Sequence, residues 1–457
     1  MSNKRKTLVF INLIITSFSS TLLSTAMIVA LPHIAADLNV SLATGQWVTS
    51  GFSLAFAIIV PLSAYLINRI STKRLYMISL MLLMAGLAVS AAATTFPVLI
   101  AGRIIQAASG AVLGAMAQVI LLTIYTKDKH GTVMGWYGLA MGFGPIVAPT
   151  ISGIIMDLYS WRMVFILSIG IIAVSMIFAL LVFDNFLPTK KAPFDIVSFT
   201  LSGFAFGALT LGAGNLPNYG ITNPFTFVPL AIGIVTLILF SKRQFALSTP
   251  FLDLSLLKDY VFALACISAF LHSFITSGSS ILIPTMMQNI YHCSATETGL
   301  FMLFPSIVFA AISPVAGTLY DKIGIHKLFM ISSVALVIGN GAMVIATEEM
   351  SILMLLLLFT LRNAALALLM MPLVTWGMSV VRQEQIAQGT AMMNTLKNVS
   401  NAVGSAVIVG FMALIAQTTA ASPHADMYGV NAAFALCTAM SVIMMVIAFF
   451  FVKPAKK

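Results

Sequence analysis

The chain has very little charge for its length. Only 8% of its 457 residues are Asp, Glu, Lys or Arg, whereas 60% are hydrophobic, and the mean hydropathy is +1.04. A soluble domain carries about 25% charged residues, so this chain could not cover a water-facing surface. The composition therefore excludes a soluble enzyme, a disordered protein and a nucleic-acid binder, although the net charge is +10.

Metal ligands and disulfide partners are also scarce. The three cysteines (Cys266, Cys293 and Cys437) stand singly, and the six histidines form no HxxxH or HxxH pair. This pattern predicts neither a disulfide framework nor a metal site, and we expect no cofactor. The chain has no clustered nucleophiles for a membrane enzyme, and its non-apolar segments are too short for the signalling domain of a sensor.

Long apolar runs make up most of the chain. Fourteen runs begin near Leu8, Trp47, Leu75, Val98, Thr132, Met163, Ile196, Phe225, Phe262, Thr298, Leu328, Ile352, Gln388 and Tyr428. A helix of about 20 apolar residues crosses a bilayer. The first run is too long for the 7–15 residue core of a signal peptide, so we expect an uncleaved helix. The sequence predicts an all-α polytopic membrane protein.

The basic residues lie on one side of these spans. With the N-terminus inside, nineteen of the 23 Lys and Arg residues fall in cytoplasmic segments, and only Arg162 falls in the opposite loops. Lys and Arg concentrate in cytoplasmic loops. We therefore expect both termini in the cytoplasm. The short N-terminus and loops are typical of a bacterial plasma-membrane protein, and we expect a monomer.

Two of the cytoplasmic loops resemble each other. Residues 64–75 and 317–328 share their apolar and basic positions, and both continue into Met-Ile-Ser. The second copy follows the tenth run, so the halves match only if two helices are inserted between them. We expect an N-terminal six-helix bundle over 1–190, two inserted helices over 191–250 and a C-terminal six-helix bundle over 251–457. Internal repeats with a substrate path between them are typical of secondary transporters.

The motifs resemble those of the major facilitator superfamily. The repeated loop is similar to its signature loop, residues 99–110 to its intramembrane arginine motif, and residues 135–153 to the glycine-proline motif of exporters. Further segments are similar to the fourteen-helix drug/proton antiporter branch: Ala30-Leu31-Pro32, Gln46-Trp47-Val48, Trp161-Arg162, Gln288 and Gly389 to Asn398.

This resemblance implies the major facilitator fold, with two six-helix bundles, two inserted helices and fourteen transmembrane helices in all. It also implies a proton-coupled exporter of amphipathic compounds, a multidrug efflux carrier that works by alternating access. The alternative is an exporter of one endogenous lipid, peptide or metabolite. The expected partners are small amphipathic substrates, protons and the lipid bilayer.

Arg103 is the most costly residue in the spans, since a charge at membrane depth costs about 2.5–3.5 kcal/mol on insertion scales. The resemblance implies that Arg103, with Gln106 in the same motif, belongs to the substrate or coupling site. Alternatively, Arg103 binds backbone carbonyls and fixes the first helix against the fourth. Arg362 also lies in a span, near Pro372, and either role remains open for it.

A polar face runs along the span that contains Lys397. Asn394, Asn398 and Asn401 recur at three- and four-residue spacing beside this lysine. In lipid such a face must look inward. It lines the substrate path or forms an interhelical hydrogen-bond seam.

Proton carriers are few, because all thirteen acidic residues lie in loops or at span ends. His272 is the only histidine deep in a span, Asp37 stands at the outer edge, and Gln288 stands near a membrane boundary. Arg103, Arg362 and Lys397 leave the spans with three positive charges. This charge predicts a cavity that prefers neutral, zwitterionic or anionic substrates over permanent cations. Alternatively, carbonyl contacts neutralise all three basic groups and leave the cavity without their charge.

Two motifs predict moving parts. Small residues and prolines in the fifth span indicate a tight, bendable contact between the halves, although ordinary helix packing would also use small residues; they are Gly142, Gly144, Pro145, Pro149 and Gly153. In the second loop copy, Asp321 can pair with basic groups or helix N-termini and close the cytoplasmic side. The loop positions concerned are Asn68, Arg69 and Arg74 in the first copy and Gly317, Asp321, Lys322 and Gly324 in the second.

Overall fold

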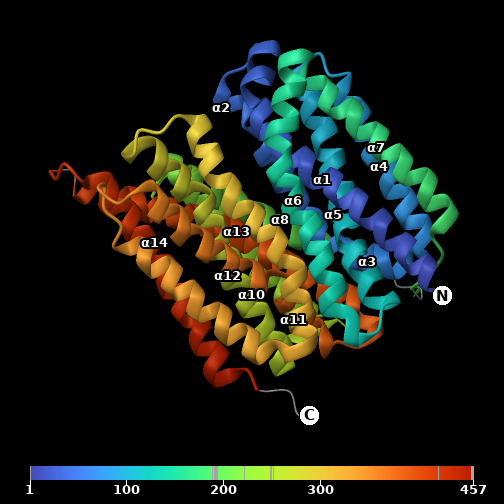
Figure 1. Cartoon of the computed structure of the whole chain (residues 1–457). Helices are drawn as coiled ribbons and strands as arrows, with labels where there is room; N and C mark the ends of the chain where they lie inside the picture. The colour runs from blue at the N-terminus through green and yellow to red at the C-terminus, as the bar shows by residue number, and fades with distance from the viewer. Residues whose placement is uncertain are drawn as a thin grey trace.

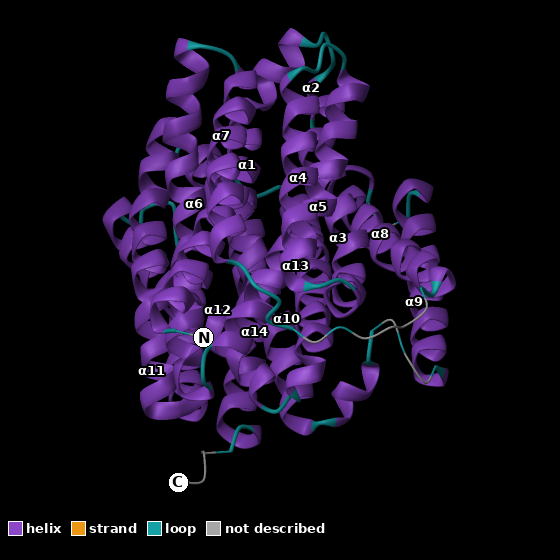
Figure 2. Cartoon of the chain, turned by 90° about the vertical axis from the view of Figure 1, so that its right-hand side faces the viewer, coloured by secondary structure: helices purple, strands orange, loops and turns teal. Residues whose placement is uncertain are grey.

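The computed structural model describes residues 2–187, 189, 194–220, 222–247, 250, 252–419 and 421–453, and within them it contains helices and loops only (Figure 2). The helices of the first half are α1 (Asn3–Asp37), α2 (Leu42–Gly45), α3 (Trp47–Arg69), α4 (Thr72–Ala91), α5 (Phe96–Ile124), α6 (His130–Leu158) and α7 (Trp161–Val182). Next come α8 (Ile196–Tyr219) and α9 (Pro224–Ala246). The last helices are α10 (Tyr260–Thr285), α11 (Ala295–Val344), α12 (Ile352–Ser379), α13 (Ile386–Thr418) and α14 (Ala425–Val446). Short 3-10 or π turns occupy Lys127–Lys129, Leu254–Lys258, Met286–Ile290, Gln383–Gln385 and Ile447–Phe451.

The long helices form two bundles that stand side by side (Figure 1). Helices α1 and α3 to α7 pack on one another in the first bundle, and α10 to α14 do so in the second. The bundles meet most extensively where α6 runs along α11. The expected all-helical membrane architecture is confirmed.

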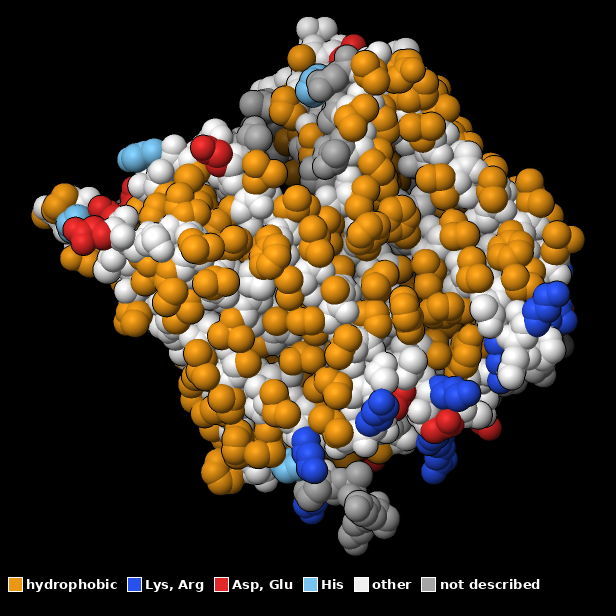
Figure 3. Space-filling view, viewed as in Figure 1, with side chains coloured by type: hydrophobic (Ala, Val, Ile, Leu, Met, Phe, Trp, Pro, Cys, Tyr) orange, Lys and Arg blue, Asp and Glu red, His pale blue; other side chains and the backbone are white. Residues whose placement is uncertain are grey.

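The outer surface suits a lipid environment. Twelve helices in the described part of the chain are long and apolar enough to cross a membrane. Figure 3 shows hydrophobic side chains over most of one face, while Lys and Arg gather near the edge from which both termini emerge. We call this edge the termini end and the opposite edge, where α1 ends and α3 begins, the far end.

The expected number of fourteen spans is not confirmed by this count of twelve. Helix α11 covers two of the expected runs in one element of 50 residues. Its backbone leaves helical geometry at Gly324 (φ 74°, ψ 170°), in the left-handed region that favours glycine. Helix α6, some of whose residues lie outside the described part, is not among the twelve.

Helices α8 and α9 form a hairpin outside both bundles. Asp195 caps α8 by accepting a hydrogen bond from the backbone of Ser198, and Gly220 ends the helix with a φ of 72°. Asn223 then caps α9, and Pro224 occupies its first position, where no backbone donor is needed. These local signals set the ends of the two helices. Helix α8 packs on α3 and α13, and α9 packs on α8.

Candidate functional site

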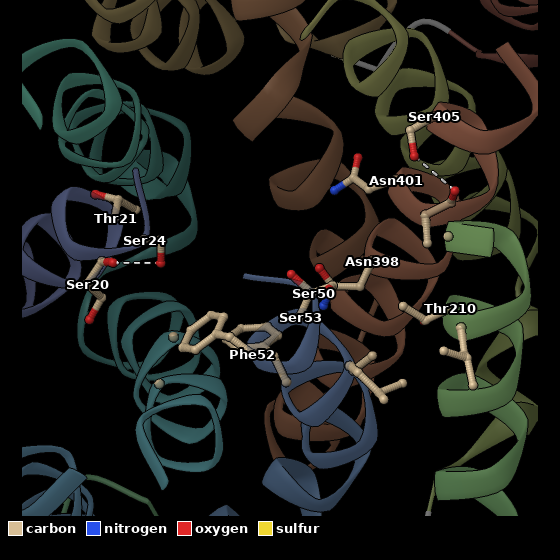
Figure 4. A pocket seen from close by; sticks show the side chains of 18 of the residues that line it. Ser20, Thr21, Ser24, Ser50, Phe52, Ser53, Thr210, Asn398, Asn401 and Ser405 are labelled. Carbon is tan, nitrogen blue, oxygen red and sulfur yellow. Dashed lines mark hydrogen bonds between the residues drawn. The ribbon is translucent and has the colours of Figure 1, made fainter. Parts of the chain in front are cut away.

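A cavity of about 760 Å³ lies between the two bundles (Figure 4). Its wall includes residues of α1, α3, α5, α6, α8 and α13. At the far end it reaches Gln46 and Trp47, where α3 begins, and Asn215 and Tyr219, where α8 ends. The cavity therefore extends from the middle of the molecule to the far end.

The wall combines hydroxyl groups with apolar surface. On α1, the hydroxyls of Ser20, Thr21 and Ser24 each donate to a backbone carbonyl of the same helix, at 3.0–3.2 Å. Their protons are thereby used, while their oxygen lone pairs remain free to accept from a ligand. Phe52 and Phe56, both on α3, add aromatic surface. No Asp, Glu, Lys or Arg is among the described residues of the wall.

The polar face of α13 divides between the cavity and the bundle contact. Asn398 and Asn401 line the cavity, as Figure 4 shows. Asn394 instead donates to Oε1 of Gln118 on α5 at 3.1 Å, which joins the two bundles. Lys397 is half-buried, and its ammonium forms no hydrogen bond or ion pair with another described residue. One helix thus contributes both to the cavity wall and to a hydrogen bond between the bundles.

Arg103 lies behind the cavity wall rather than on it. Its side chain is fully buried; Nε donates to the carbonyl of Val48 on α3 at 3.1 Å, and Nη1 donates to Oε1 of Gln106 at 2.7 Å. The guanidinium carbon stands 4.2 Å from the ring centre of Phe52, which does line the cavity. Gln106 in turn donates to the carbonyl of Gly86 and to Ser90 on α4. Arg103 therefore holds α3 and Phe52 in place, and its helix partner is α3, not the expected first helix.

Arg362 has a comparable position in the second bundle. Its Nε donates to Oδ1 of Asn340 at 2.5 Å, and Nη2 donates to the carbonyl of Ile275 on α10 at 2.8 Å. Its Nη1 is buried and has no hydrogen-bond partner among the described residues. Nearby, Nε2 of His272 lies 2.9 Å from the carbonyl of Leu366. Neither residue is part of the described cavity wall.

Asp321 closes the termini end. Its carboxylate accepts hydrogen bonds from the backbone amides of Gly131 (2.9 Å) and Thr132 (2.7 Å) and from the Thr132 hydroxyl (2.7 Å). These donors belong to the first turn of α6, where the helix dipole favours a negative charge. Lys127 adds a bond from its Nζ to the carbonyl of Ser379 at 3.0 Å. Both contacts connect the first bundle to the second.

Glycines of α6 allow the two bundles to touch backbone to backbone. A Cβ on Gly135 would lie 2.6 Å from the carbonyl oxygen of Ser313 on α11, and a Cβ on Gly142 would lie 3.3 Å from Phe309. Gly317 of α11 leaves equally little room, since its Cβ would meet the carbonyl of Gly131. Gly144, by contrast, faces Thr21 of α1, so its close contact lies inside the first bundle.

Comparison with known proteins decides the family. The sequence profile of the Major Facilitator Superfamily matches residues 13–405 and 266–457. An uncharacterized MFS-type transporter of Bacillus subtilis, YcnB, is 32% identical over 443 residues, which cover 96% of this chain and 94% of that protein. The chain belongs to the major facilitator superfamily. It is accordingly a multi-pass membrane carrier and not an enzyme.

Other members are similar over most of the chain. The lincomycin resistance protein LmrB of Bacillus subtilis is 30% identical, over an alignment that covers 97% of this chain and 95% of LmrB. The multidrug export protein EmrB of Haemophilus influenzae is 27% identical, with coverages of 86% and 77%. Among solved structures, the human organic anion transporter MFSD10 superposes with a TM-score of 0.68 at 15% identity, covering 98% of this chain and 100% of its own. This last likeness supports the fold alone.

Several predicted positions lie away from the cavity of this facilitator. Asp37 accepts a hydrogen bond from Nη1 of Arg162 at 2.7 Å and one from the indole of Trp161 at 3.2 Å, so it ties α1 to α7 at the far end. Gln288 is exposed within the π turn that follows α10. The side chains of Asn68, Arg69 and Arg74 form no hydrogen bond or ion pair with described residues, and Lys322 is exposed. Pro145 is an exposed residue of α6, whereas the surroundings of Pro149 and Gly153 lie outside the described part.

The sequence patterns missed some residues of the site. Gln118 and Gly131 lie at the contact between the bundles, and Thr210 of α8 lies on the cavity wall. Gly131 could have been found from the sequence, because it lies in the first turn of the helix whose N-terminus faces Asp321 of the second loop copy. Gln118 and Thr210 could not, since each lies alone in an apolar run.

Proposed function

We propose that this facilitator exports small amphipathic, mainly uncharged compounds from the cell by alternating access. The main support for this proposal is the cavity of about 760 Å³ between the bundles, with hydroxyl, amide and aromatic groups on its wall. Drug-sized ligands occupy pockets of about 300–1,000 Å³ with mostly apolar walls and a few polar groups. The similarity to LmrB and EmrB, named for lincomycin resistance and multidrug export, supports drugs as substrates.

The proposed topology has fourteen spans with both termini in the cytoplasm of a bacterial cell. A helix of 50 residues would be about 75 Å long at 1.5 Å per residue, far more than a bilayer core of about 30 Å, so α11 counts as two spans that meet at Gly324. Helix α6, with 29 residues, is the remaining span. The bundles then correspond to 1–190 and 251–457, with α8 and α9 in the inserted segment 191–250, as in the drug/proton antiporter branch, and the carrier acts as a monomer. The boundaries fall at or beside residues outside the described part.

In this topology the structure represents the state open to the outside. Asp321 and Lys127 hold the bundles together at the cytoplasmic end, while the cavity reaches the opposite end. Export requires a second state in which these bonds break and the cavity opens to the cytoplasm. The drive for that cycle is proposed to be the proton gradient.

Lys397 is the proposed proton carrier. Arg103 and Arg362 donate to carbonyl or amide oxygens, and Asp37 is paired with Arg162. Lys397 forms no such bond, yet stands on the α13 face beside Asn398 and Asn401 of the cavity wall. A lysine can release a proton when it is desolvated, whereas an arginine keeps its own. His272 is the second candidate, since an imidazole can take up and release a proton near neutral pH.

Accumulation measurements test the function. Cells that lack their own exporters and express this chain should accumulate several-fold less lincomycin and less of a neutral amphipathic dye such as Nile red, and a protonophore should abolish the difference. Lys397→Gln should remove the response to the proton gradient, while Arg382→Gln, at an exposed loop end, should not. Unchanged accumulation of every compound in a broad panel, together with export of one endogenous lipid, peptide or metabolite, would favour the narrower alternative.

A further inference from the structure

We propose that α8, one of the two inserted helices, is a wall of the substrate cavity and closes the side between α3 and α13 against lipid. The inference rests on the proposed function, because it assigns part of the substrate contact to a helix outside both bundles. This proposal predicts that the inserted hairpin takes part in transport and does not only pack on the outer surface of the bundles.

The position of α8 between the bundles is the first observation. Gly203 and Gly207 face α3, where a Cβ on Gly207 would lie 3.2 Å from Ile58. On its other side α8 packs on α13, with Leu216 3.6 Å from the Cβ position of Gly410. Helix α8 therefore contacts the first bundle and the second at once. Figure 2 shows α8 beside α3, with α9 farther out.

The second observation is that one face of α8 continues from this packing into the cavity. Gly203, Gly207, Thr210 and Gly214 recur every three or four residues and so share one face of the helix. Gly203 and Gly207, nearer the termini end, pack on α3. Thr210 and Gly214, nearer the far end, line the cavity. Figure 4 shows Thr210 on the side of the cavity opposite Ser20 and Ser24 of α1. A Cβ on Gly214 would meet no atom within 4 Å, so the wall is open there.

The third observation is how the hairpin is anchored. At the termini end, Nη2 of Arg243 on α9 forms an ion pair with Asp195 at 2.9 Å, and Gln244 accepts from the backbone of Leu252 at 3.0 Å. Asp253 then donates from its backbone to Gln388 of α13 at 3.0 Å. This chain of bonds ties the hairpin to the second bundle. Its contact with α3 is apolar and glycine-lined, which suits sliding when the bundles move.

The outer helix of the hairpin has the opposite character. Phe225, Phe227 and Val235 of α9 are exposed, as lipid-facing side chains are. Gly212 and Gly233 let α8 and α9 approach closely, with Cβ positions 2.7 Å from Leu230 and Leu209. The hairpin is thus a two-layer barrier, with α9 toward lipid and α8 toward the cavity.

Cysteine labelling tests the wall without relying on transport. In a variant whose three cysteines are replaced by alanine, Thr210→Cys, Ser53→Cys and Val235→Cys would be labelled from outside the cell with a membrane-impermeant maleimide. Ser53 lines the cavity from α3. Val235 is an exposed residue of α9, about 200° around that helix from Gly233, which contacts Leu209 beside Thr210. We expect Thr210→Cys and Ser53→Cys to react at least tenfold faster than Val235→Cys, because a thiolate forms only in water. Equal, slow reaction of Thr210→Cys and Val235→Cys beside fast Ser53→Cys would overturn the proposal.

A set of identical substitutions tests the contribution to transport. Gly114 on α5 and Gly214 on α8 both line the cavity, and Gly170 on α7 is exposed elsewhere; an added Cβ meets nothing within 4 Å at any of them. Gly214→Leu and Gly114→Leu should each reduce lincomycin efflux at least fivefold, while Gly170→Leu should not. A Gly214→Leu variant that exports like the wild type, beside an impaired Gly114→Leu, would refute the wall. If the wild type itself exports no tested compound, the proposed function fails, but the labelling result still decides the position of α8.

Discussion

Each bundle buries an arginine that donates to oxygens of the backbone and of amide side chains. Arg103 binds the Val48 carbonyl and Gln106, and Arg362 binds the Ile275 carbonyl and Asn340. A buried charge persists only when hydrogen bonds replace its lost hydration. The same bonds place Arg103 directly behind Phe52, so a residue outside the cavity wall can still shape the cavity.

Replacing Arg103 should therefore impair both stability and transport. Arg103→Ala removes the donor to the buried Oε1 of Gln106, at a cost of about 1–3 kcal/mol, and releases Phe52 from the guanidinium. We expect a lower melting temperature and loss of efflux, with partial recovery in Arg103→Lys, which lacks the planar fork of donors. Thermal unfolding of the purified protein and efflux at equal expression check both parts. Arg74→Ala, at an exposed arginine, is the control; wild-type behaviour of Arg103→Ala would contradict this role.

At the scale of single helices, α6 has two contacts that differ in kind. Gly135 faces Ser313 of α11, across the boundary between the bundles, whereas Gly144 faces Thr21 of α1, within one bundle. In the proposed transport cycle, a side chain at the first position opposes a contact that opens and closes. A side chain at the second position opposes a contact that both proposed states keep.

The two glycines should therefore respond differently to the same change. Gly135→Leu should separate the bundles at the termini end, since its Cβ would lie 2.6 Å from the Ser313 carbonyl, while each bundle stays folded. Gly144→Leu should lower the melting temperature instead. Spin labels at the exposed residues Lys129 and Lys322 report the separation, and unfolding reports stability. Identical effects of the two variants, or a shift caused by Gly170→Leu, would contradict the assignment.

The hairpin anchor provides a prediction about pH. Partial burial favours the neutral form of Asp195, but hydrogen bonds from Arg243 and Ser198 outweigh it and lower the pKa of Asp195 to about 2. A depressed pKa means that the contact stabilises the protein above the ordinary value of 3.8 and loses that effect as pH falls toward 2. Between pH 5 and 8 the anchor should be constant.

Removing the charge should mimic acid at neutral pH. Asp195→Asn should increase hydrogen exchange in α8 and α9 relative to the wild type, by the same factor at pH 5 and at pH 8. The reason is that the carboxylate is ionised throughout this range in the wild type. Asp184→Asn, in the half-exposed pair with Arg5, is the control, since it lies outside the hairpin. A wild-type hairpin that loosens between pH 8 and pH 5 would argue against Asp195 as its anchor.

At the scale of the whole molecule, the cavity carries less positive charge than the three basic residues of the spans had suggested. Arg103 and Arg362 are buried within their bundles and donate to oxygen acceptors, and Lys397 is not part of the described wall. The cavity is therefore polar and uncharged in its described part, not strongly positive. Neutral substrates remain the expected class, but the reason is the absence of a counter-charge and not repulsion.

A neutral amphipathic dye should accordingly be exported at least tenfold better than its bis-quaternary analogue. A dication would lose hydration in the cavity without meeting a carboxylate. Ser53→Asp places one on the wall and should improve export of the dication, while Ser53→Asn should not. Efficient export of the dication by the wild type, or no gain in Ser53→Asp, would refute an uncharged cavity.

The sequence by itself determined the membrane class, the positions of the apolar helices, the family and Asp321 as an acidic residue that can bind a helix N-terminus. These follow from hydropathy, charge asymmetry and loop spacing, which are local properties that the bilayer enforces on every span. Asp321 could be predicted because a lone carboxylate in a repeated basic loop has few partners. Asn398 and Asn401 could be placed toward the interior because lipid tolerates no such polar face.

Only the tertiary structure decided which surfaces meet. It set Gly135 against α11 and Gly144 against α1, placed Arg103 behind Phe52, paired Asn394 with Gln118 and brought Thr210 of α8 to the cavity. Lipid tails are as apolar as most side chains, so hydropathy cannot tell a helix face that packs on protein from one that faces lipid. The choice depends on shape, on close approach at glycines and on single hydrogen bonds, and these exist only after the helices have come together.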